Sequence, residues 1–147
     1  MKIAFACDHG GYPVKEEVLS YLKELGHEVV DFGTFSMDSC NYPEFALKAS
    51  LAVAKGECEK GVIICSSGEG VCMMANKVNG VRAGIGYNDE VSHLIVEHNH
   101  ANVICFGAKF MSAEEIKNRI SIFLSATPMG GRHDIRVDMM DQYEKNR

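Results

Sequence analysis

Short apolar runs without polar interruption alternate along this chain with longer segments whose apolar residues recur every three or four positions. Such a run predicts a buried strand, and the longer spacing predicts an amphipathic helix. The predicted strands cover residues 2–6, 28–31, 61–64, 81–85 and 103–106. The predicted helices cover residues 14–25, 44–55, 71–77, 89–97, a segment that opens with the capping-box pattern Ser112–Glu115, and the tail that begins at Arg132.

Strands that are separated by helices form a parallel sheet with right-handed crossovers and helices on both faces. The chain is therefore predicted to be α/β: a single-domain, Rossmann-like (flavodoxin-like), three-layer sandwich with a five-stranded parallel sheet and a C-terminal helical tail. In the flavodoxin-like strand order 2-1-3-4-5, ligands bind between the first and third strands, at their carboxyl ends. Two segments would face each other there, Cys7–Gly11 and Cys65–Gly70.

Length and composition limit the classes of function. The 147 residues are enough for one domain, residues 1–147, with a sizeable core. The net charge of -5 argues against a nucleic-acid or anionic-membrane partner, and no apolar stretch is long enough to span a membrane. The six cysteines form no CxxC pair, which argues against a zinc site, and no signal peptide precedes the first strand. We therefore expect a cytoplasmic protein with reduced cysteines.

The loop Cys65–Gly70 is the strongest candidate for chemistry. Its residues Ser66, Ser67, Gly68 and Gly70 are small, so their backbone N–H groups can converge on an anion. A thiol beside such a group of donors is favoured as thiolate. The alternative is a cysteine that only packs in the core, because cysteine is among the most buried residue types.

Three further groups of polar residues are candidates. Asp8 and His9 follow the first strand, where they can act as acid, orienting group or phosphate contact; the alternative is an Asx-turn. Arg132 and Arg136 are four residues apart, so on a helix their guanidinium groups share one face and fit a phosphate. The alternative for them is a solvated turn with the nearby aspartates 134 and 138 as partners.

His98 and Asn99 precede the fifth predicted strand, at its amino end. A polar cluster in this position is ordinarily a solvated loop. The two residues become candidates for the site only if something brings them to it, for example a second subunit.

Several short segments recur in this sequence in the order of a known family. These segments are Cys7–Gly11, Asn41–Pro43, Ile64–Gly68, Ala75–Lys77, Val81–Ala83, His98–Asn99, Ala101–Val103 and Gly130–His133. Together they resemble the ribose-5-phosphate isomerase B and galactose-6-phosphate isomerase family of sugar-phosphate isomerases. The resemblance runs from the first strand into the last helix.

The resemblance implies a metal-free aldose–ketose isomerase without a cofactor, with ribose 5-phosphate and ribulose 5-phosphate as the substrate pair. It also implies a homodimer or tetramer whose active sites lie at the subunit interface. By similarity Cys65 is the base, Asp8 and His98 assist ring opening, and the neighbouring subunit supplies His98. The other implied roles are enediolate stabilisation by Asn99, Ser67 and the backbone of Ser66, Gly68, Glu69 and Gly70, sugar contact by Tyr42, and phosphate binding by His9, Arg132, Arg136 and Lys109.

The sequence departs from the family pattern in the loop itself. Ser66 stands where the family has glycine, which narrows the site, and Glu69 adds a carboxylate to a loop that cradles an anion. Asn41 and Lys109 replace Asp and Arg. Two alternatives therefore stay open: an isomerase of a six-carbon sugar 6-phosphate, such as allose or galactose 6-phosphate, and a sugar-phosphate-binding module without catalysis.

Overall fold

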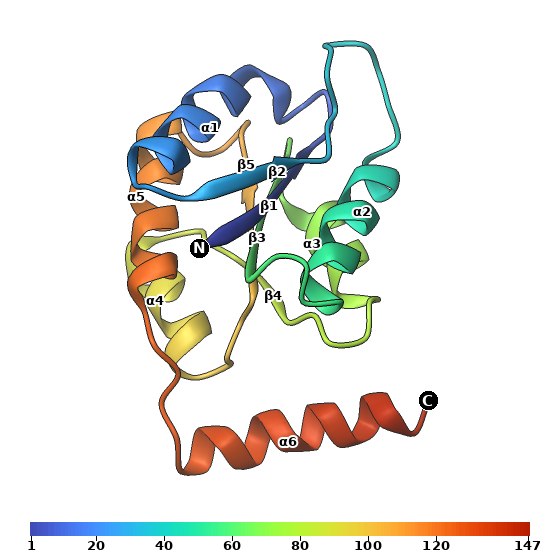
Figure 1. Cartoon of the computed structure of the whole chain (residues 1–147), viewed down its shortest axis with the longest axis vertical. Coiled ribbons are helices and arrows are strands. Elements are labelled where there is room, and N and C mark those ends of the chain that lie inside the picture. The colour runs from blue at the N-terminus through green and yellow to red at the C-terminus, as the bar shows by residue number, and fades with distance from the viewer.

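A five-stranded parallel sheet forms the middle layer of the fold in the computed structural model, which describes residues 1–147 (Figure 1). The strands are β1 (Lys2–Cys7), β2 (Glu28–Asp31), β3 (Lys60–Cys65), β4 (Ala83–Ile85) and β5 (Val103–Gly107). The helices are α1 (Lys15–Glu24), which follows a 3-10 turn at Tyr12–Val14, and α2 (Tyr42–Ala54), α3 (Glu69–Asn76), α4 (Asp89–Glu97), α5 (Ala113–Ser125) and α6 (Arg132–Lys145). The predicted fold class is confirmed.

Alternate residues of each strand face two different helix layers. In β1, Ile3 and Phe5 face α1, α4 and α5, whereas Ala4 and Ala6 face α2 and α3. On the side that faces α2 and α3, both the sheet and the helix carry small residues. Helix α2 packs Ala46, Ala49 and Ala52 against this face of the sheet. Small side chains on both surfaces allow α2 to lie close to the sheet, whereas larger aromatic and aliphatic side chains fill the other side.

The strand order is β2-β1-β3-β5-β4 and not the expected 2-1-3-4-5. All five residues of β5 are buried, whereas the three residues of β4 are only partly buried. A strand that is apolar on both faces is stable in the sheet interior, so β5 lies beside β3 and the short β4 forms the edge. The reversal of strand order between β1 and β3 is unaffected, so the predicted ligand-binding position is retained.

The first residues of helices α5 and α3 show how local sequence determines where a helix begins. The Ser112 hydroxyl of α5 accepts a hydrogen bond from the N–H of Glu115, and the Glu115 carboxylate accepts one from the N–H of Ser112, so the predicted capping box is confirmed. Helix α3 begins at Glu69, two residues before the predicted start at Val71. Its N-cap Gly68 has a φ of 83°, and a Cβ there would lie 2.9 Å from the carbonyl carbon of Phe106. Both observations require glycine at this position.

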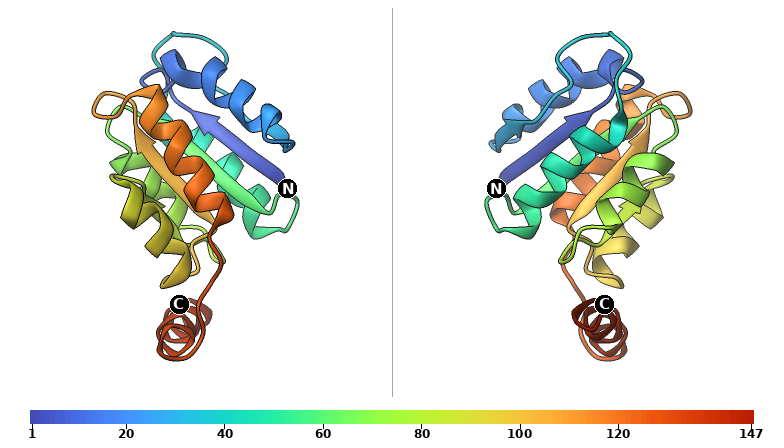
Figure 2. Two further views of the ribbon diagram at one scale, coloured as in Figure 1. Left: turned by 90° about the vertical axis from the view of Figure 1, so that its left-hand side faces the viewer. Right: turned by 90° about the vertical axis from the view of Figure 1, so that its right-hand side faces the viewer.

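Helix α6 extends beyond the sandwich, across the foot of the view in Figure 1, and is seen end-on in Figure 2. Its buried side chains, those of His133 and Val137, pack against the rest of the chain. The predicted helical tail is thus confirmed. Its other apolar residues, among them Ile135 and Tyr143, are 64% and 70% exposed. No helix of the chain combines the length and apolar character that crossing a membrane requires.

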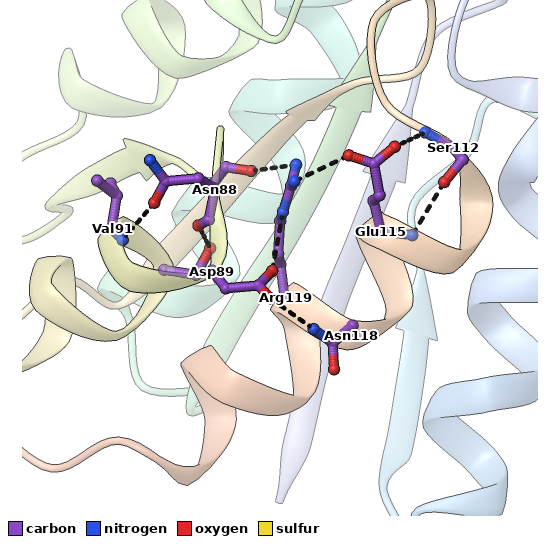
Figure 3. Close-up of polar contacts among 9 residues, drawn as sticks. Asn88, Asp89, Val91, Ser112, Glu115, Asn118 and Arg119 are labelled. Carbon is purple, nitrogen blue, oxygen red and sulfur yellow. Dashed lines mark hydrogen bonds and ion pairs between the residues drawn. The ribbon is translucent and has the colours of Figure 1, made fainter.

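A buried arginine joins α5 to the start of α4 (Figure 3). The guanidinium of Arg119 donates to the carbonyl of Gly86 at 3.2 Å, to Asp89 Oδ1 at 3.3 Å and to Glu115 Oε2 at 2.9 Å. Asn118 adds a hydrogen bond to the other oxygen of Asp89, on the exposed side. The hydrogen bonds to Gly86 and Asp89 therefore fix the loop after β4, and the third stays within α5.

Replacing this side chain tests its contribution to stability. We expect Arg119→Met to lower the free energy of unfolding by about 2 kcal/mol, because the variant leaves the Gly86 carbonyl without its donor and removes the ion pairs to Asp89 and Glu115. The matched control is Asn118→Ala, which removes only an exposed contact and should change stability by less than about 0.5 kcal/mol. Urea unfolding of both variants measures the difference; equal losses would show that Arg119 contributes no more than a surface contact.

Candidate active site

The predicted site residues fall into two groups at opposite edges of the sheet. The carboxyl-edge group follows the ends of β1, β3 and β5, together with the first residue of α2. It consists of Asp8, His9, Tyr42, Cys65, Ser66, Ser67, Gly68, Glu69, Gly70 and Lys109. The expected meeting of the loops after β1 and β3 is observed, because a Cβ on Gly10 would lie 2.1 Å from the hydroxyl oxygen of Ser66.

The amino-edge group lies where the strands begin. It consists of His98, Asn99, Arg132 and Arg136, at the end of α4 and the start of α6. The linker before α6 is joined to α4 by a hydrogen bond from the N–H of Met129 to the carbonyl of Glu97. At about 3.3 Å per residue, strands of five or six residues separate the two edges by about 16–20 Å. One chain therefore does not bring the two groups together.

Cys65 ends β3 at the switch point between β1 and β3. Its side chain is buried, and its Sγ accepts a hydrogen bond from the N–H of Gly68 at 3.1 Å. That N–H belongs to the N-cap of α3, so the sulfur lies at the positive end of a helix. Both features stabilise negative charge on the sulfur. The N–H groups of Ser66, Ser67 and Gly70 make no hydrogen bond within the chain, so they remain as donors to an anion.

The neighbouring cysteines have different surroundings from Cys65. Burial raises the pKa of Cys7 to about 12, so this residue stays a neutral thiol at the end of β1. A hydrogen bond to Cys72, together with burial, raises the pKa of Cys105. The same hydrogen bond lowers the pKa of Cys72. This pair in α3 and β5 was not anticipated from the sequence, and all six cysteines are free.

Asp8 combines both roles that the sequence left open. Its Oδ1 accepts hydrogen bonds from the N–H groups of Gly10 at 2.8 Å and Gly11 at 3.1 Å, which is the Asx-type turn. Its Oδ2 has no hydrogen-bond partner within the chain. One oxygen therefore fixes the loop while the second is available to a ligand.

His9 has its ring orientation fixed by a residue that sequence reasoning missed. The backbone N–H of Cys40 donates to His9 Nδ1 at 3.2 Å, and the Cys40 thiol lies 3.8 Å from the same nitrogen. Because a backbone N–H is always a donor, Nδ1 is the acceptor and Nε2 carries the hydrogen. His9 thus presents an N–H to a ligand. No local pattern predicts this contact, since Cys40 is distinguished only by its place beside Asn41.

The remaining carboxyl-edge residues surround the Cys65 loop. The ring of Tyr42 lies over Gly70, where a Cβ would come within 2.6 Å of its Cζ. The Ser67 hydroxyl accepts a hydrogen bond from the N–H of Glu69 at 3.2 Å, and the Glu69 side chain is exposed in the first turn of α3. The N–H of Lys109 donates to the carbonyl of Ser66, which joins the loops after β3 and β5.

The amino-edge group is organised around two stacked imidazole rings. The ring centroids of His98 and His133 are 4.2 Å apart and the rings are 7° from parallel. Arg132 and Arg136 form no ion pair within the chain, and Asp134 contacts His100 instead, at 3.5 Å. The alternative of aspartate partners for the arginines is thus not observed. Two exposed guanidinium groups on one helix face remain free to bind an anion.

Asn99 lines a cavity of about 320 Å³ together with Arg82 and Met140, between α4, the edge strand β4 and α6. His133, like Cys40, was not predicted from the sequence as a residue of the site. Its position between Arg132 and Arg136 could have indicated it. No group of three or more His, Cys, Asp or Glu side chains has an arrangement that could hold a metal ion.

Comparison with known proteins gives consistent matches over nearly the whole chain. Residues 3–140 match the family model described as Ribose/Galactose Isomerase. Ribose-5-phosphate isomerase B of Escherichia coli (strain K12) is 40% identical over 146 residues, which is 99% of this chain and 98% of that protein. The structure of ribose-5-phosphate isomerase B from Clostridium thermocellum aligns with a TM-score of 0.97, at 40% identity and 99% coverage of both chains.

A further solved structure carries a ligand. It is that of ribose-5-phosphate isomerase B from Mycoplasma genitalium with bound ribulose-5-phosphate. It aligns with a TM-score of 0.96 and 36% identity, and covers 99% of this chain and 97% of that chain.

The stacked histidines make stability depend on pH. Burial, and then His98, Arg132 and Arg136, lower the pKa of His133, while Glu97 acts in the opposite direction. Below the ordinary histidine value of about 6.5, the unfolded chain therefore binds more protons at this position than the folded chain. Stability from His133 is present above that value and is lost as the pH falls towards the lowered pKa.

We expect His133→Phe to reduce this loss, because phenylalanine keeps a flat ring that does not titrate. Urea unfolding at pH 7.5 and at pH 5.5 (about one pH unit either side of the ordinary histidine value) measures the change in unfolding free energy for both proteins. An equal change in wild type and variant would contradict the proposed behaviour of His133. His27→Gln is the control, because the His27 ring contacts the N-terminal amine and takes no part in the stack.

Proposed function

The chain belongs to the ribose/galactose isomerase family, whose members are aldose–ketose isomerases, and we propose that it interconverts ribose 5-phosphate and ribulose 5-phosphate. We propose further that Cys65 moves the proton between C2 and C1 through an enediolate. Residues 1–147 would act as one sugar-phosphate isomerase domain. The relatives described above support this choice of substrate pair.

The observation that carries the mechanism is the position of the Cys65 sulfur. It lies at the switch point between β1 and β3, accepts an N–H from Gly68, and is surrounded by further N–H groups without partners. A base and oxyanion donors in one loop are what proton removal beside a carbonyl requires. Cys7, at the end of the adjacent strand, is a neutral thiol, because burial raises its pKa to about 12.

The reaction begins with the opening of the sugar ring. The bond between C1 and the ring oxygen O4 breaks, the C1 hydroxyl loses its proton, and O4 gains one. The free Oδ2 of Asp8 is suited to take the hydroxyl proton, and the imidazolium of His98 to donate to O4. These roles make the two residues a complementary acid and base.

The Cys65 thiolate then removes the C2 proton of the open aldose, and the electrons move to O1 to form the enediolate. The thiol returns the proton to C1, and the O2 hydroxyl proton passes to O1, which yields the ketose. The N–H groups of Ser66, Ser67 and Gly70, with the side chain of Asn99, would stabilise the negative oxygen.

The phosphate would be held by cationic and N–H donors from both edges. His9 offers its Nε2 hydrogen and Lys109 an ammonium group at the carboxyl edge. Arg132 and Arg136 offer two unpaired guanidinium groups at the amino edge. Phosphate binding far from C2 orients the reacting carbon against the base.

The separation of the two edges supports a site that is shared between two copies of the chain. The carboxyl-edge group of one copy would face the amino-edge group of the other in a homodimer, or in a tetramer of such dimers. A two-fold arrangement makes two identical sites of this kind. The exposed apolar residues of α6 are consistent with a helix that contacts a partner.

A six-carbon sugar 6-phosphate is the second candidate substrate, because the matching family model includes galactose isomerases. Comparison of kcat/KM for ribose 5-phosphate, allose 6-phosphate and galactose 6-phosphate separates the candidates. We expect the largest value for ribose 5-phosphate. Absence of activity on ribose 5-phosphate would reject this choice of substrate.

The role of Cys65 is tested by its removal. We expect Cys65→Ala to lower kcat by about 10²- to 10⁴-fold, because the general base is lost. Binding of ribose 5-phosphate, measured by calorimetry, should stay within about threefold, because the groups that hold the phosphate remain. Exchange of the C2 proton for solvent deuterium should fall together with turnover.

Cys58→Ala is the matched control, since Cys58 is a buried cysteine outside both edge groups. It should keep both turnover and C2 exchange. A Cys65→Ala protein with a substantial fraction of wild-type exchange would assign the base to another residue. Wild-type protein that binds ribose 5-phosphate without any exchange would instead support a binding module.

A further inference from the structure

The imidazole of His98 is oriented by stacking. Its ring lies 4.2 Å from that of His133 and nearly parallel to it, while neither of its nitrogens has a hydrogen-bond partner within the chain. His98 is the C-cap of α4, and its backbone N–H donates to the carbonyl of Leu94. The backbone is therefore fixed, and the face of His133 is the contact that sets the plane of the ring.

His133 is itself rigidly held. Its side chain is only 4% exposed, beside Val137 in the first turns of α6. The far end of α6 is joined to the loop before β4 by an ion pair between Arg82 and Asp141 at 3.1 Å. A hydrogen bond from the N–H of Gly80 to Glu144 at 2.9 Å adds to this connection. The helix cannot rotate about its axis without breaking these contacts.

The charge on His133 matters as much as its position. Burial and the neighbouring His98, Arg132 and Arg136 lower the pKa of His133, with Glu97 opposing them, so the ring is neutral near pH 7. A positive charge on His133 would repel a positive charge on His98. A neutral aromatic face instead attracts a cation placed over it. A neutral ring beneath His98 therefore does not repel the positive charge that a proton donor carries.

We propose that His133 is the positioning residue for His98, because it holds the plane of the His98 ring for the opening of the sugar ring. The proposal rests on the proposed function, since it requires a cyclic substrate. In this role His133 touches no reacting atom. It would fix the plane of the His98 ring, and with it the approach of the His98 N–H to the ring oxygen of a substrate bound to the other copy.

Two substitutions and two substrates distinguish a positioning role of His133 from a general loss of folding or activity. His133→Leu removes the flat ring and keeps apolar bulk, while His133→Phe keeps a flat, neutral ring. Ribose 5-phosphate must be opened, whereas 4-deoxyribose 5-phosphate has no O4 hydroxyl and exists only as the open chain. In 4-deoxyribose 5-phosphate the phosphate is separated from the carbonyl by the same number of carbon atoms as in open-chain ribose 5-phosphate.

We expect His133→Leu to lower kcat on ribose 5-phosphate by about tenfold, with KM changed less than about threefold, because proton donation is impaired and binding is not. His133→Phe should lose less than about threefold, which is rescue by the conservative variant. On the open-chain analogue the loss for His133→Leu should shrink to less than about twofold. Equal losses on both substrates, or no loss on ribose 5-phosphate, would overturn the proposal.

The ring protons of His98 give a readout that does not depend on activity. In wild type the ring current of His133 should shift their NMR resonances upfield, and His98→Gln identifies them by their disappearance. The shift should persist in His133→Phe and vanish in His133→Leu. Identical resonances in wild type and His133→Leu would reject the stack itself. If the wild-type protein showed the upfield shift but no isomerase activity, the proposed function would be rejected, and the role of His133 with it. The stack itself would still be supported.

Discussion

Parallel strand direction is the constraint on which the rest of the structure depends. When all strands run the same way, every loop that follows a strand emerges at one edge of the sheet, and every loop that precedes one lies at the other. Asp8 and Cys65 therefore meet, because β1 and β3 are neighbours. His98 and Arg132 lie at the far edge for the same reason. A sheet about 16–20 Å across separates the two groups of residues, and under the proposed function a second copy of the chain would bring them together.

The two edges also differ in their electrostatic character. The carboxyl edge stabilises negative charge through N–H groups around the Cys65 sulfur, which suits a thiolate and an enediolate. The amino edge carries the unpaired guanidinium groups of Arg132 and Arg136, in a chain whose net charge is -5. Unpaired cations in an otherwise acidic protein favour the binding of an anion beside them. A sugar phosphate, with a reactive carbonyl at one end and a dianion at the other, matches both.

Much of the fold could be predicted from the sequence, because short apolar runs and helical spacing directly reflect burial. The loops after β1 and β3 were predictable as a pair for the same reason. The order of β4 and β5 was not, since it depends on which strand is the more buried on both faces. The start of α3 depends on the left-handed backbone of Gly68, which lets the helix begin directly beside Cys65. The contact of Cys40 with His9 and the stack of His133 on His98 join segments far apart in sequence, so no local pattern encodes them.

Mixed dimers test most directly whether one site is built from two copies. Cys65→Ala protein and the double variant Arg132→Ala/Arg136→Ala would be co-expressed with different affinity tags, and the mixed species purified through both. Each variant alone should be nearly inactive at low ribose 5-phosphate. In a mixed dimer, one of the two shared sites carries both defects and the other carries neither. The mixed dimer should therefore recover about half of the wild-type activity. A mixed dimer no more active than the separate variants would contradict a shared site.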